Sequence, residues 1–354
     1  MARFRRSVAI DLGSSEVLVY LNNKGLVLEE PSVIAIDVLT DEILAVGEEA
    51  KKLVGRTPGN IKAIKPMKDG VIADFPSTEK MLKYFLDKTI SKALIKPDVL
   101  ICVPSRSTQV ERRAVLQASE NAGAHRTYLI EEPLAAAIGA GVDITEASGD
   151  MVIDIGGGTT DIAVISAGEI IVSKSIPVAG ISFDNAIKDF IRKRYGLLIG
   201  DNKAEEIKIK ANSLEDNQTI EVSGRQINDG LPNKIIITLG EIHTALKASE
   251  DLIVDGVKSV LELTPPELAS DIFEKHIILT GGGSYTLGLR DRLSEKFQVN
   301  VIIVEDADKC VINGTGKALG WLDEVDKGLD DSRKAKQKEL ENKEKLRRRW
   351  WQKN

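Results

Sequence analysis

The sequence is poor in aromatic residues and in cysteine. Aromatics make up 4% of the 354 residues, and there are two cysteines and three histidines. Cys102 and Cys310 lie far apart in apolar segments, so we expect small buried hydrophobes in a reducing compartment, not a disulfide framework. The histidines show no metal-ligand spacing with one another or with the cysteines. The chain is long enough for two domains, whose cores must be aliphatic.

Long hydrophobic runs are absent. No run approaches the roughly 20 apolar residues that a membrane-spanning helix needs. Residues 1–6 lead straight into an apolar segment, without the hydrophobic stretch of a signal peptide. The sequence therefore predicts a cytoplasmic protein.

Charge is unevenly distributed along the chain. Residues 330–354 hold ten Lys or Arg against five Asp or Glu, a net charge of +5, which leaves −11 for the preceding residues. An acidic body argues against a general nucleic-acid binder, so no nucleic-acid partner is expected. The basic tail is therefore expected to have a role separate from that of the acidic body.

One short phrase occurs twice, 143 residues apart, as Ile10-Asp11-Leu12-Gly13 and as Ile153-Asp154-Ile155-Gly156. Each copy ends an apolar run, enters a turn of small residues and is followed by another β-rich run. Glycine lets backbone N–H groups approach an anion closely, and the Asp can hold Mg²⁺ through its waters. Two such hairpins indicate two related domains that clamp the phosphates of a nucleotide.

Strands alternate with helices through most of the chain, which predicts an α/β protein. Residues 99–104 resemble a buried strand, and the capping box at Thr108 begins a helix that we expect to end near Asn121. Residues 183–247 look like an inserted subdomain with two helical stretches and a β-rich segment at 234–239. A further strand at 277–280 runs into a glycine triplet.

Five segments resemble, in order, the nucleotide-site motifs of the actin/Hsp70/sugar-kinase superfamily: 11–15, 131–137, 154–161, 280–284 and 314–318. The resemblance is closest to the MreB family of bacterial actins and covers residues 7 to about 322. It implies an actin-like fold with two related domains, each with a mixed sheet flanked by helices. ATP or ADP with Mg²⁺ would bind in the cleft between them.

The resemblance also implies a division into four subdomains and a tail. Subdomain IA would comprise 1–32, 66–145 and 315–324, and subdomain IB would comprise 33–65. Subdomain IIA would comprise 146–181 and 245–314, and subdomain IIB would comprise 182–244. Residues 325–354 form the basic tail.

Phosphate chemistry assigns roles to the motif residues, because cleaving a γ-phosphate needs charge neutralisation, backbone donors and a positioned water. Asp11 and Asp154 can hold the Mg²⁺ shell from opposite domains. The donors would come from Gly13, Ser14, Ser15, Gly156, Gly157, Gly158 and Thr159. By resemblance, Glu132 and Thr159 orient the attacking water. Alternatively, Glu132 only compensates the dipole of a helix N-terminus, and Asp161 is either a surface residue or an indirect Mg²⁺ partner.

The adenosine would lie against a glycine triplet and a helix. Gly281, Gly282 and Gly283 follow a strand and allow close backbone approach to a base or an α-phosphate. Glu205 and Lys208 lie one helical turn apart, and by resemblance they contact ribose and adenine. An ordinary surface ion pair between them is the alternative. Without the resemblance, residues 313–316 would be interpreted as the turn that starts a helix.

The first turn departs from the family pattern, which usually has Thr-Ala-Asn-Thr after the glycine. Here Ser14 can replace Thr as a hydroxyl donor. Glu16 either places an acidic group near the phosphates, where repulsion weakens binding or slows hydrolysis, or turns away from the cleft.

Two segments are candidates for membrane contact. Leu94 and Ile95 align with the apolar loop by which MreB proteins insert into bilayers, although a helix end packed on the sheet is an alternative. The tail combines cations with interfacial tryptophans, in Arg347, Arg348, Arg349, Trp350 and Trp351. These residues predict contact with an anionic membrane from its cytoplasmic side, unless the tail is only a solvated charged segment.

The resemblance implies a slow ATPase that forms filaments beneath the membrane and takes part in cell shape. The protein would pair with itself in double protofilaments, with Val110 at the pairing face, and other actin-like paralogues or cell-shape proteins are further possible partners. The tail and the altered turn point to a divergent paralogue, of the kind found in wall-less helical swimming bacteria. A small-molecule kinase and a division or pilus-assembly ATPase adaptor are the alternatives.

Overall fold

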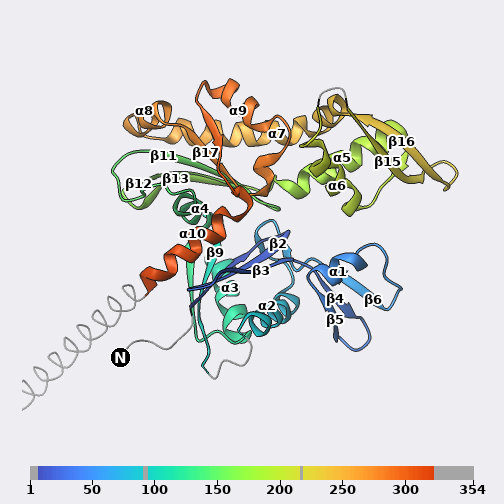
Figure 1. The fold of residues 1–354 in the computed structure, drawn as a ribbon, viewed down its shortest axis with the longest axis horizontal. Helices are drawn as coiled ribbons and strands as arrows, with labels where there is room; N and C mark the ends of the chain where they lie inside the picture. Colours follow the sequence, from blue (N-terminus) through green and yellow to red (C-terminus); the bar gives the residue numbers. More distant parts are fainter. Residues whose placement is uncertain (1–6, 91–94, 216–217, 323–354) are drawn as a thin grey trace, which may run out of the picture.

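The fold consists of two α/β domains, each built on a five-stranded mixed sheet (Figure 1). The computed structural model describes residues 7–90, 95–215 and 218–322. The first sheet has the order β10-β9-β1-β2-β3, with the bounds Arg126–Glu131, Asp98–Val103, Ser7–Leu12, Glu16–Leu21 and Gly25–Pro31. The second has the order β13-β12-β11-β17-β18, with the bounds Glu169–Ile176, Thr160–Ser166, Asp150–Ile155, Ile277–Thr280 and Val301–Ile303.

The two sheets share one topology. In each, three antiparallel strands that follow one another in sequence form a meander, β1 to β3 in one domain and β11 to β13 in the other. The first strand of each meander then pairs in parallel with a later strand, β9 or β17, which pairs in parallel with the last. The prediction of two related domains from the repeated phrase is therefore confirmed.

Helices cover the sheets and fill the space between the domains (Figure 1). The first sheet packs against α2 (Phe75–Thr89) and α3 (Gln109–Asn121), which begins at the expected Thr108 capping box. The second packs against α5 (Gly180–Tyr195), α7 (Leu239–Leu263), α8 (Pro266–Glu274) and α9 (Leu289–Phe297). Helices α4 (Glu132–Gly139) and α10 (Cys310–Ala318) pack together at the centre.

Glycine makes the contact between α4 and α10 possible. A Cβ on Gly314 would lie 1.8 Å from the carbonyl oxygen of Ala135, and one on Gly139 would lie 2.0 Å from that of Cys310. Residues 313–316 therefore lie inside a helix, which excludes the alternative of a turn that starts one. Their small side chains serve helix packing instead.

Each domain carries a smaller subdomain on the same side of the molecule (Figure 1). In the first domain this is a sheet of β4, β5 and β6 with α1, bounded by Ile34–Asp37, Ile43–Val46, Ile61–Ile64 and Glu48–Leu53. In the second it contains α6 with a sheet of β14, β15 and β16, bounded by Asp201–Ala211, Leu197–Leu198, Thr219–Gln226 and Pro232–Thr238. The sequence had shown only β16, because β15 buries just two of its alternating side chains, Ile220 and Val222.

The remaining elements are short. A two-stranded hairpin is made by β7 (Met67–Lys68) and β8 (Val71–Ile72). Three 3₁₀ turns span Gly282–Tyr285, Ala307–Lys309 and Leu319–Trp321. Over the described ranges, no helix combines the length and apolar character required to cross a bilayer.

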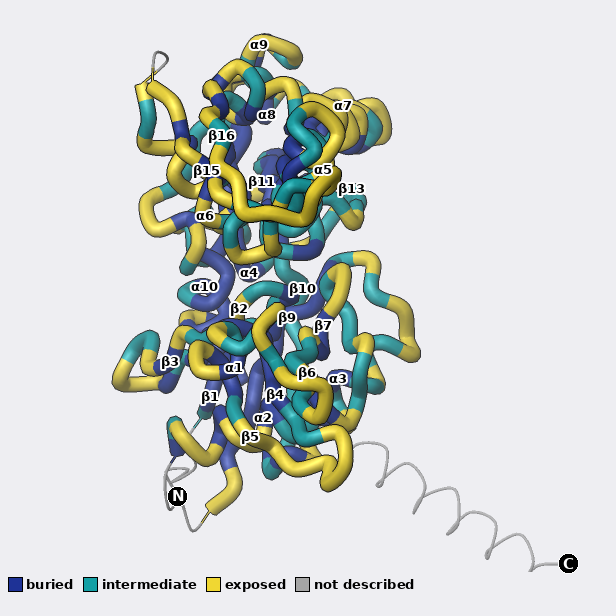
Figure 2. Tube along the Cα trace, turned by 90° about the vertical axis from the view of Figure 1, so that its right-hand side faces the viewer, coloured by how far each residue is buried: buried dark blue, intermediate teal, exposed yellow. Residues whose placement is uncertain are grey.

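The cores are aliphatic, as the composition predicts, and lie around the two sheets (Figure 2). Phe85 and Phe183 are the largest fully buried side chains, one in each domain. Cys102 and Cys310 are both buried and unbridged, which confirms their interpretation as small core residues.

Candidate functional site

A cavity of about 560 Å³ lies where the two domains meet, and both repeated turns open into it. This volume falls within the usual range for small-ligand sites. The cavity brings together all residues that the sequence assigned to nucleotide, metal or catalysis: Asp11, Gly13, Ser14, Ser15, Glu132, Asp154, Gly156, Gly157, Gly158, Thr159, Glu205, Lys208, Gly281, Gly282 and Gly283.

The two repeated turns have the same internal geometry. In the first, the amide of Gly13 donates to the carbonyl of Glu16 at 3.0 Å, and in the second the amide of Gly156 donates to that of Thr159 at 2.9 Å. The turns touch each other, because a Cβ on Gly157 would lie 2.1 Å from the Oγ of Ser15. Two backbone turns thus converge from opposite domains, an arrangement suited to an anion.

A third loop closes this end of the cavity. At the tip of the β7–β8 hairpin, the amide of Gly70 donates to the Oγ of Ser14 at 3.0 Å. A Cβ on Gly70 would come within 3.2 Å of the Oγ1 of Thr159. Three separate loops, one of which carries Thr159, therefore meet at this end of the cavity.

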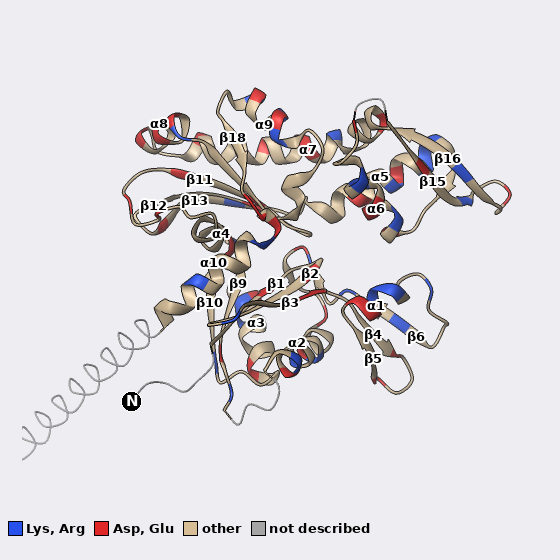
Figure 3. Ribbon diagram, in the orientation of Figure 1, with Lys and Arg blue, Asp and Glu red and all other residues tan. Residues whose placement is uncertain are grey.

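Carboxylates gather at the same end, near the inner ends of the central strands (Figure 3). Burial raises the pKa of Asp11 to about 6, although the Cys102 thiol donates to it at 3.3 Å. Burial also raises the pKa of Asp154 to about 7, against a hydrogen bond from Thr280 at 2.6 Å. Burial, and then repulsion from neighbouring carboxylates, raises the pKa of Glu132 well above its usual range.

This donor set fits a magnesium ion held mainly through water. Several carboxylates in one low-dielectric site repel each other, and a polyphosphate would add further negative charge, so a divalent cation suits the site. Within the described ranges, no three His, Cys, Asp or Glu side chains are grouped to hold an ion directly. Asp11 and Asp154 would therefore hold the ion from either side through its waters.

Asp161 is fully buried beside this cluster, so its interpretation as a surface residue was wrong. Its Oδ1 accepts hydrogen bonds from the amide and the Oγ of Ser105, both at 3.0 Å. Its Oδ2 accepts one from Ser175 at 3.0 Å. Ser105 follows β9 in the first domain and Asp161 lies on β12 in the second, so these bonds join the domains.

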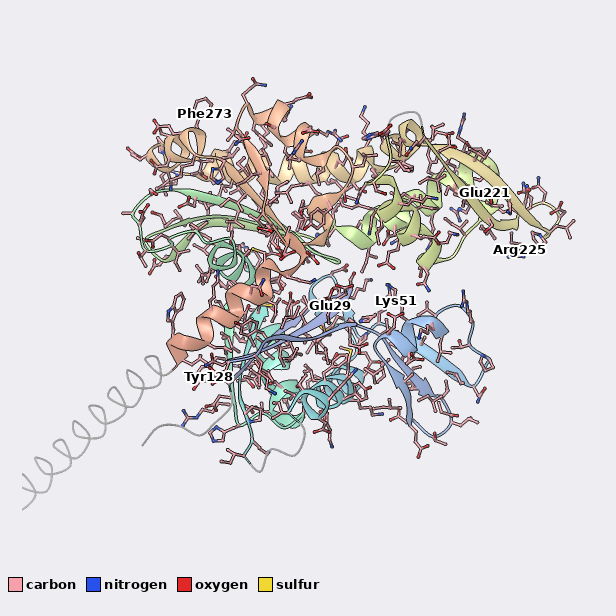
Figure 4. The ribbon with its side chains drawn as sticks, in the orientation of Figure 1. Glu29, Lys51, Tyr128, Glu221, Arg225 and Phe273 are labelled. Carbon is pink, nitrogen blue, oxygen red and sulfur yellow. The ribbon has the colours of Figure 1, made fainter. Side chains whose placement is uncertain are left out.

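The other end of the cavity is lined by α6. Glu205 forms an ion pair at 2.9 Å with Lys51 on α1, which lies on the opposite side of the cleft (Figure 4). Lys208 instead contacts Asp184 at 2.9 Å and the carbonyl of Gly180 at 3.1 Å. The alternative of an ion pair between Glu205 and Lys208 was therefore wrong, since each has a different partner.

Glu16 turns toward the cleft. It lines the cavity, and its pKa is raised by burial and then by the charge of Glu29, while Lys51 opposes the shift. Of the two alternatives for this residue, the structure supports the acidic group near the ligand site.

Sequence reasoning missed several lining residues: Gly180, Ile209, Asn212, Tyr285, Thr286 and Asp308. Two of them could have been found from the sequence, because Ile209 lies one helical turn after Glu205, and Asn212, the C-cap residue of α6, lies one turn after Lys208. Gly180 is the first residue of α5, and Tyr285, Thr286 and Asp308 lie in or next to short 3₁₀ turns, which no periodicity marks.

Comparison with known proteins identifies this arrangement. The sequence model of the MreB/Mbl protein family matches residues 5–327. The chain belongs to the MreB/Mbl family. It is 49% identical over 328 residues to the cell shape-determining protein Mbl of Bacillus subtilis, covering 92% of this chain and 98% of Mbl. It is 46% identical over 329 residues to the cell shape-determining protein MreB of Escherichia coli, covering 90% of this chain and 95% of that MreB.

Solved structures of MreB/Mbl relatives confirm the actin-like fold. MreB5 of Spiroplasma citri bound to ADP matches with a TM-score of 0.86 and 36% identity, covering 92% of this chain and 99% of that one. The same protein bound to AMPPNP matches with a TM-score of 0.87, covering 93% of this chain and 99% of that one. The MamK double helical filament matches with a TM-score of 0.75 and 21% identity, covering 90% of this chain and 99% of that one. At this identity it supports the fold alone.

Two of the residues assigned to surfaces, Val110 and Ile95, do not line the cavity. Val110 is 76% exposed in the first turn of α3, and Ile95 is 48% exposed before β9. Leu94 and the tail residues Arg347, Arg348, Arg349, Trp350 and Trp351 fall outside the described residues.

Proposed function

We propose that the protein is an ATP-dependent, filament-forming cytoskeletal protein whose slow hydrolysis of ATP accompanies polymer dynamics. The observation that carries the proposal is that turns from both domains, buried carboxylates and Thr159 converge on one cavity. Relatives named for determining cell shape, and a relative solved with ADP and with AMPPNP, support it.

At the phosphate end, the backbone of the two turns would hold the anion. Ser14 and Ser15 would add hydroxyl donors from the first domain, opposite the glycines of the second. Mg²⁺, when bound, would neutralise phosphate charge, held through water by Asp11 and Asp154. Glu132 and Thr159 would accept the hydrogens of a water and so direct its lone pair at the γ-phosphorus.

At the nucleoside end, Glu205 and Lys208 would contact ribose and adenine from α6. The backbone of 281–283 would approach the base or the α-phosphate from the other wall. Glu16 adds negative charge between these ends, so we propose that it slows hydrolysis or weakens binding compared with family members that have a neutral residue there.

Hydrolysis would be coupled to assembly through domain closure. Because the turns of both domains touch each other, losing the γ-phosphate would change how tightly the domains close, and contacts between subunits can respond to that change. We propose a homopolymer of double protofilaments in which Val110 lies at the pairing face. The exposure of this apolar side chain supports the assignment.

We propose that the protein is cytoplasmic and lies on the inner face of the cell membrane. Leu94 and Ile95 would insert at the interface, and Arg347, Arg348, Arg349, Trp350 and Trp351 would bind anionic lipid. The exposed side chain of Ile95 supports the first contact. A role in helical shape or motility, and contacts with other actin-like or cell-shape proteins, remain parts of this proposal.

We propose four subdomains with the bounds given above, namely IA (1–32, 66–145, 315–324), IB (33–65), IIA (146–181, 245–314) and IIB (182–244). The two five-stranded sheets form the centres of IA and IIA, and the smaller sheets form those of IB and IIB. Residues 325–354 remain a separate tail.

Sedimentation of the purified chain tests the function. With Mg-ATP we expect polymer in the pellet and slow release of phosphate, and without nucleotide we expect mostly soluble protein. A small-molecule kinase would instead transfer phosphate to an added sugar acceptor and remain soluble. Failure to bind ATP, or binding without any polymer at high concentration, would refute the proposal.

A further inference from the structure

We propose that Thr280 and Cys102 are positioning residues, each of which orients one of the two aspartates that would hold Mg²⁺ through its waters. Thr280 contacts Asp154 in the second domain, and Cys102 contacts Asp11 in the first. The inference rests on the proposed ATPase function and deepens it, because that function leaves both residues without a role. Neither lines the cavity, so each would act only through its aspartate.

The shared topology of the two sheets places these donors at equivalent positions. In the second domain, Asp154 lies directly opposite Thr280 where β11 pairs in parallel with β17. In the first domain, the parallel register of β1 with β9 ends one residue before Asp11 and Cys102, which therefore lie side by side. In both domains the donor thus comes from the strand that runs parallel to the one carrying the aspartate.

Each donor binds one oxygen of its aspartate from inside the protein. The Oγ1 of Thr280 donates to the Oδ1 of Asp154 at 2.6 Å, and the Sγ of Cys102 donates to the Oδ1 of Asp11 at 3.3 Å. Thr280 is fully buried and Cys102 is 3% exposed, so bulk water does not compete for these bonds. Among the described residues, no other group donates to either carboxylate.

A hydrogen bond to one oxygen fixes the orientation of a carboxylate. The terminal torsion of an aspartate side chain is broad and roughly two-fold, so a carboxylate without a donor can rotate about it. With Oδ1 bound to the protein, Oδ2 remains as the acceptor for the waters of the cation. Partners of this kind behind metal-binding groups contribute about 10–100-fold to metal affinity. We expect the lower end of this range here, because the aspartates would act through water.

The two donors differ in strength. A thiol is a weak donor compared with a hydroxyl, and its bond to Asp11 is also the longer one. The thiol hydrogen has a second acceptor as well, the carbonyl oxygen of Ile10 at 3.7 Å. Loss of the Thr280 donor is therefore expected to weaken the binding of Mg²⁺ more than loss of the Cys102 donor.

Thr280→Val and Cys102→Ala test the proposal, because each removes a donor. The dissociation constant of a fluorescent ADP analogue, measured with Mg²⁺ and with EDTA, gives the factor by which the cation tightens binding. We expect Thr280→Val to lower this factor about tenfold and Cys102→Ala to lower it about two- to threefold. Affinity in EDTA is expected to change by less than about twofold. An equal loss with Mg²⁺ and with EDTA would overturn the proposal in favour of a purely structural role.

Thr280→Ser keeps the hydroxyl and is expected to retain the wild-type factor. Thr264→Val is the matched control. It removes another buried threonine hydroxyl, which donates to the carbonyl of Val260 at 2.8 Å and does not line the cavity. We expect this variant to leave the factor unchanged. A fall with Thr280→Ser as large as that with Thr280→Val would show that the hydroxyl is not the group that matters, and would overturn the proposal.

A second measurement needs no variant and remains decisive if Thr280→Val fails to fold. In a high-resolution structure of the whole chain with ADP and Mg²⁺, we expect Thr280 and Cys102 to keep their bonds to Oδ1. We also expect the other oxygen of each aspartate to accept from a water of the cation. Aspartates turned away from these donors would overturn the inference alone. Wild-type protein that binds no nucleotide would instead overturn the proposed function, and this inference with it.

Discussion

Lys51 and Glu205 join the two domains across the mouth of the cavity, with 2.9 Å between Nζ and Oε2. About a third of each side chain is exposed, so the ion pair contributes at most about 1 kcal/mol. Glu205 also lines the cavity, so a bound ribose and Lys51 would compete for the same carboxylate.

We expect Lys51→Met to speed the release of a bound nucleotide by about two- to fivefold, because one contact that holds the cleft closed is lost. Dissociation of a fluorescent ADP analogue measures this. Lys52→Met, on the same helix but paired with Glu49 instead, is the matched control and is expected to leave the rate unchanged. A wild-type rate in Lys51→Met would show that the ion pair does not restrain the cleft.

Glu132→Ala or Thr159→Ala is expected to leave ATP binding largely intact while phosphate release falls about 100-fold, because general-base and positioning groups contribute on this scale. Equilibrium binding and a phosphate-release assay on each variant separate the two effects. Turnover at the wild-type rate in both variants would reject the roles assigned to these residues.

The stability of the protein without nucleotide and magnesium is expected to depend on pH. The pKa values of Asp11 and Asp154 are raised to about 6 and about 7 in the folded chain, so between about pH 4 and 7 it binds more protons than the unfolded chain. Stability is therefore expected to fall as pH rises through this window. The melting temperature is predicted to drop by about 5–10 °C between pH 5 and 7.5.

Asp154→Asn provides the control, since removing the titrating group is expected to flatten this slope. Saturating Mg-ADP is also expected to flatten it, because the bound cation favours the charged carboxylates. A melting temperature that rises from pH 5 to 7.5 in the free protein would contradict the assigned burial of these groups.

Val110→Glu is expected to yield single protofilaments or none, because it places a charge in an apolar contact. Electron microscopy of ATP-grown polymer shows the difference directly. Val110 is 76% exposed in the free chain, so the melting temperature and ATP binding of the variant are expected not to change and serve as controls. Paired filaments of normal appearance would exclude this residue from the interface.

Deleting residues 330–354 is expected to lower binding to anionic liposomes and to leave phosphate release intact, since the cavity residues all precede residue 320. Binding through the tail is expected to weaken strongly above about 0.15 M salt, where the Debye length is near 8 Å. Co-sedimentation across a salt series measures both effects, with neutral liposomes as the control.

If the truncated chain binds anionic lipid as the intact chain does at low salt, the tail is not a membrane anchor. The loop would then carry the contact, and Leu94→Asp with Ile95→Asp tests this in the truncated chain. A fall in liposome binding at an unchanged melting temperature would assign the contact to the loop.

The sequence was sufficient to predict the features that depend on a repeated motif or on a local pattern of residues. The duplicated phrase predicted two related domains, and the capping box at Thr108 placed the start of α3. Contacts between residues far apart in sequence left no such signal. Asp161 accepts hydrogen bonds from Ser105, 56 residues earlier, and Glu205 pairs with Lys51 from the other domain. Gly314 also looked like a turn residue, because its contact with α4 exists only in the folded protein.

The close backbone contact between α4 and α10 is a fixed point between the two domains. Gly314 and Gly139 bring these helices too close for either to slide, and α4 also packs against Val152 and Ala163 of the second sheet. If one domain rotated about this contact, residues near it would move little. The largest displacement would be at α1 and α6, which face each other across the cleft far from the contact. If the protein assembles as proposed, a small rearrangement around a phosphate would be amplified by this geometry into a larger displacement at α1 and α6, where a neighbouring subunit could make contact.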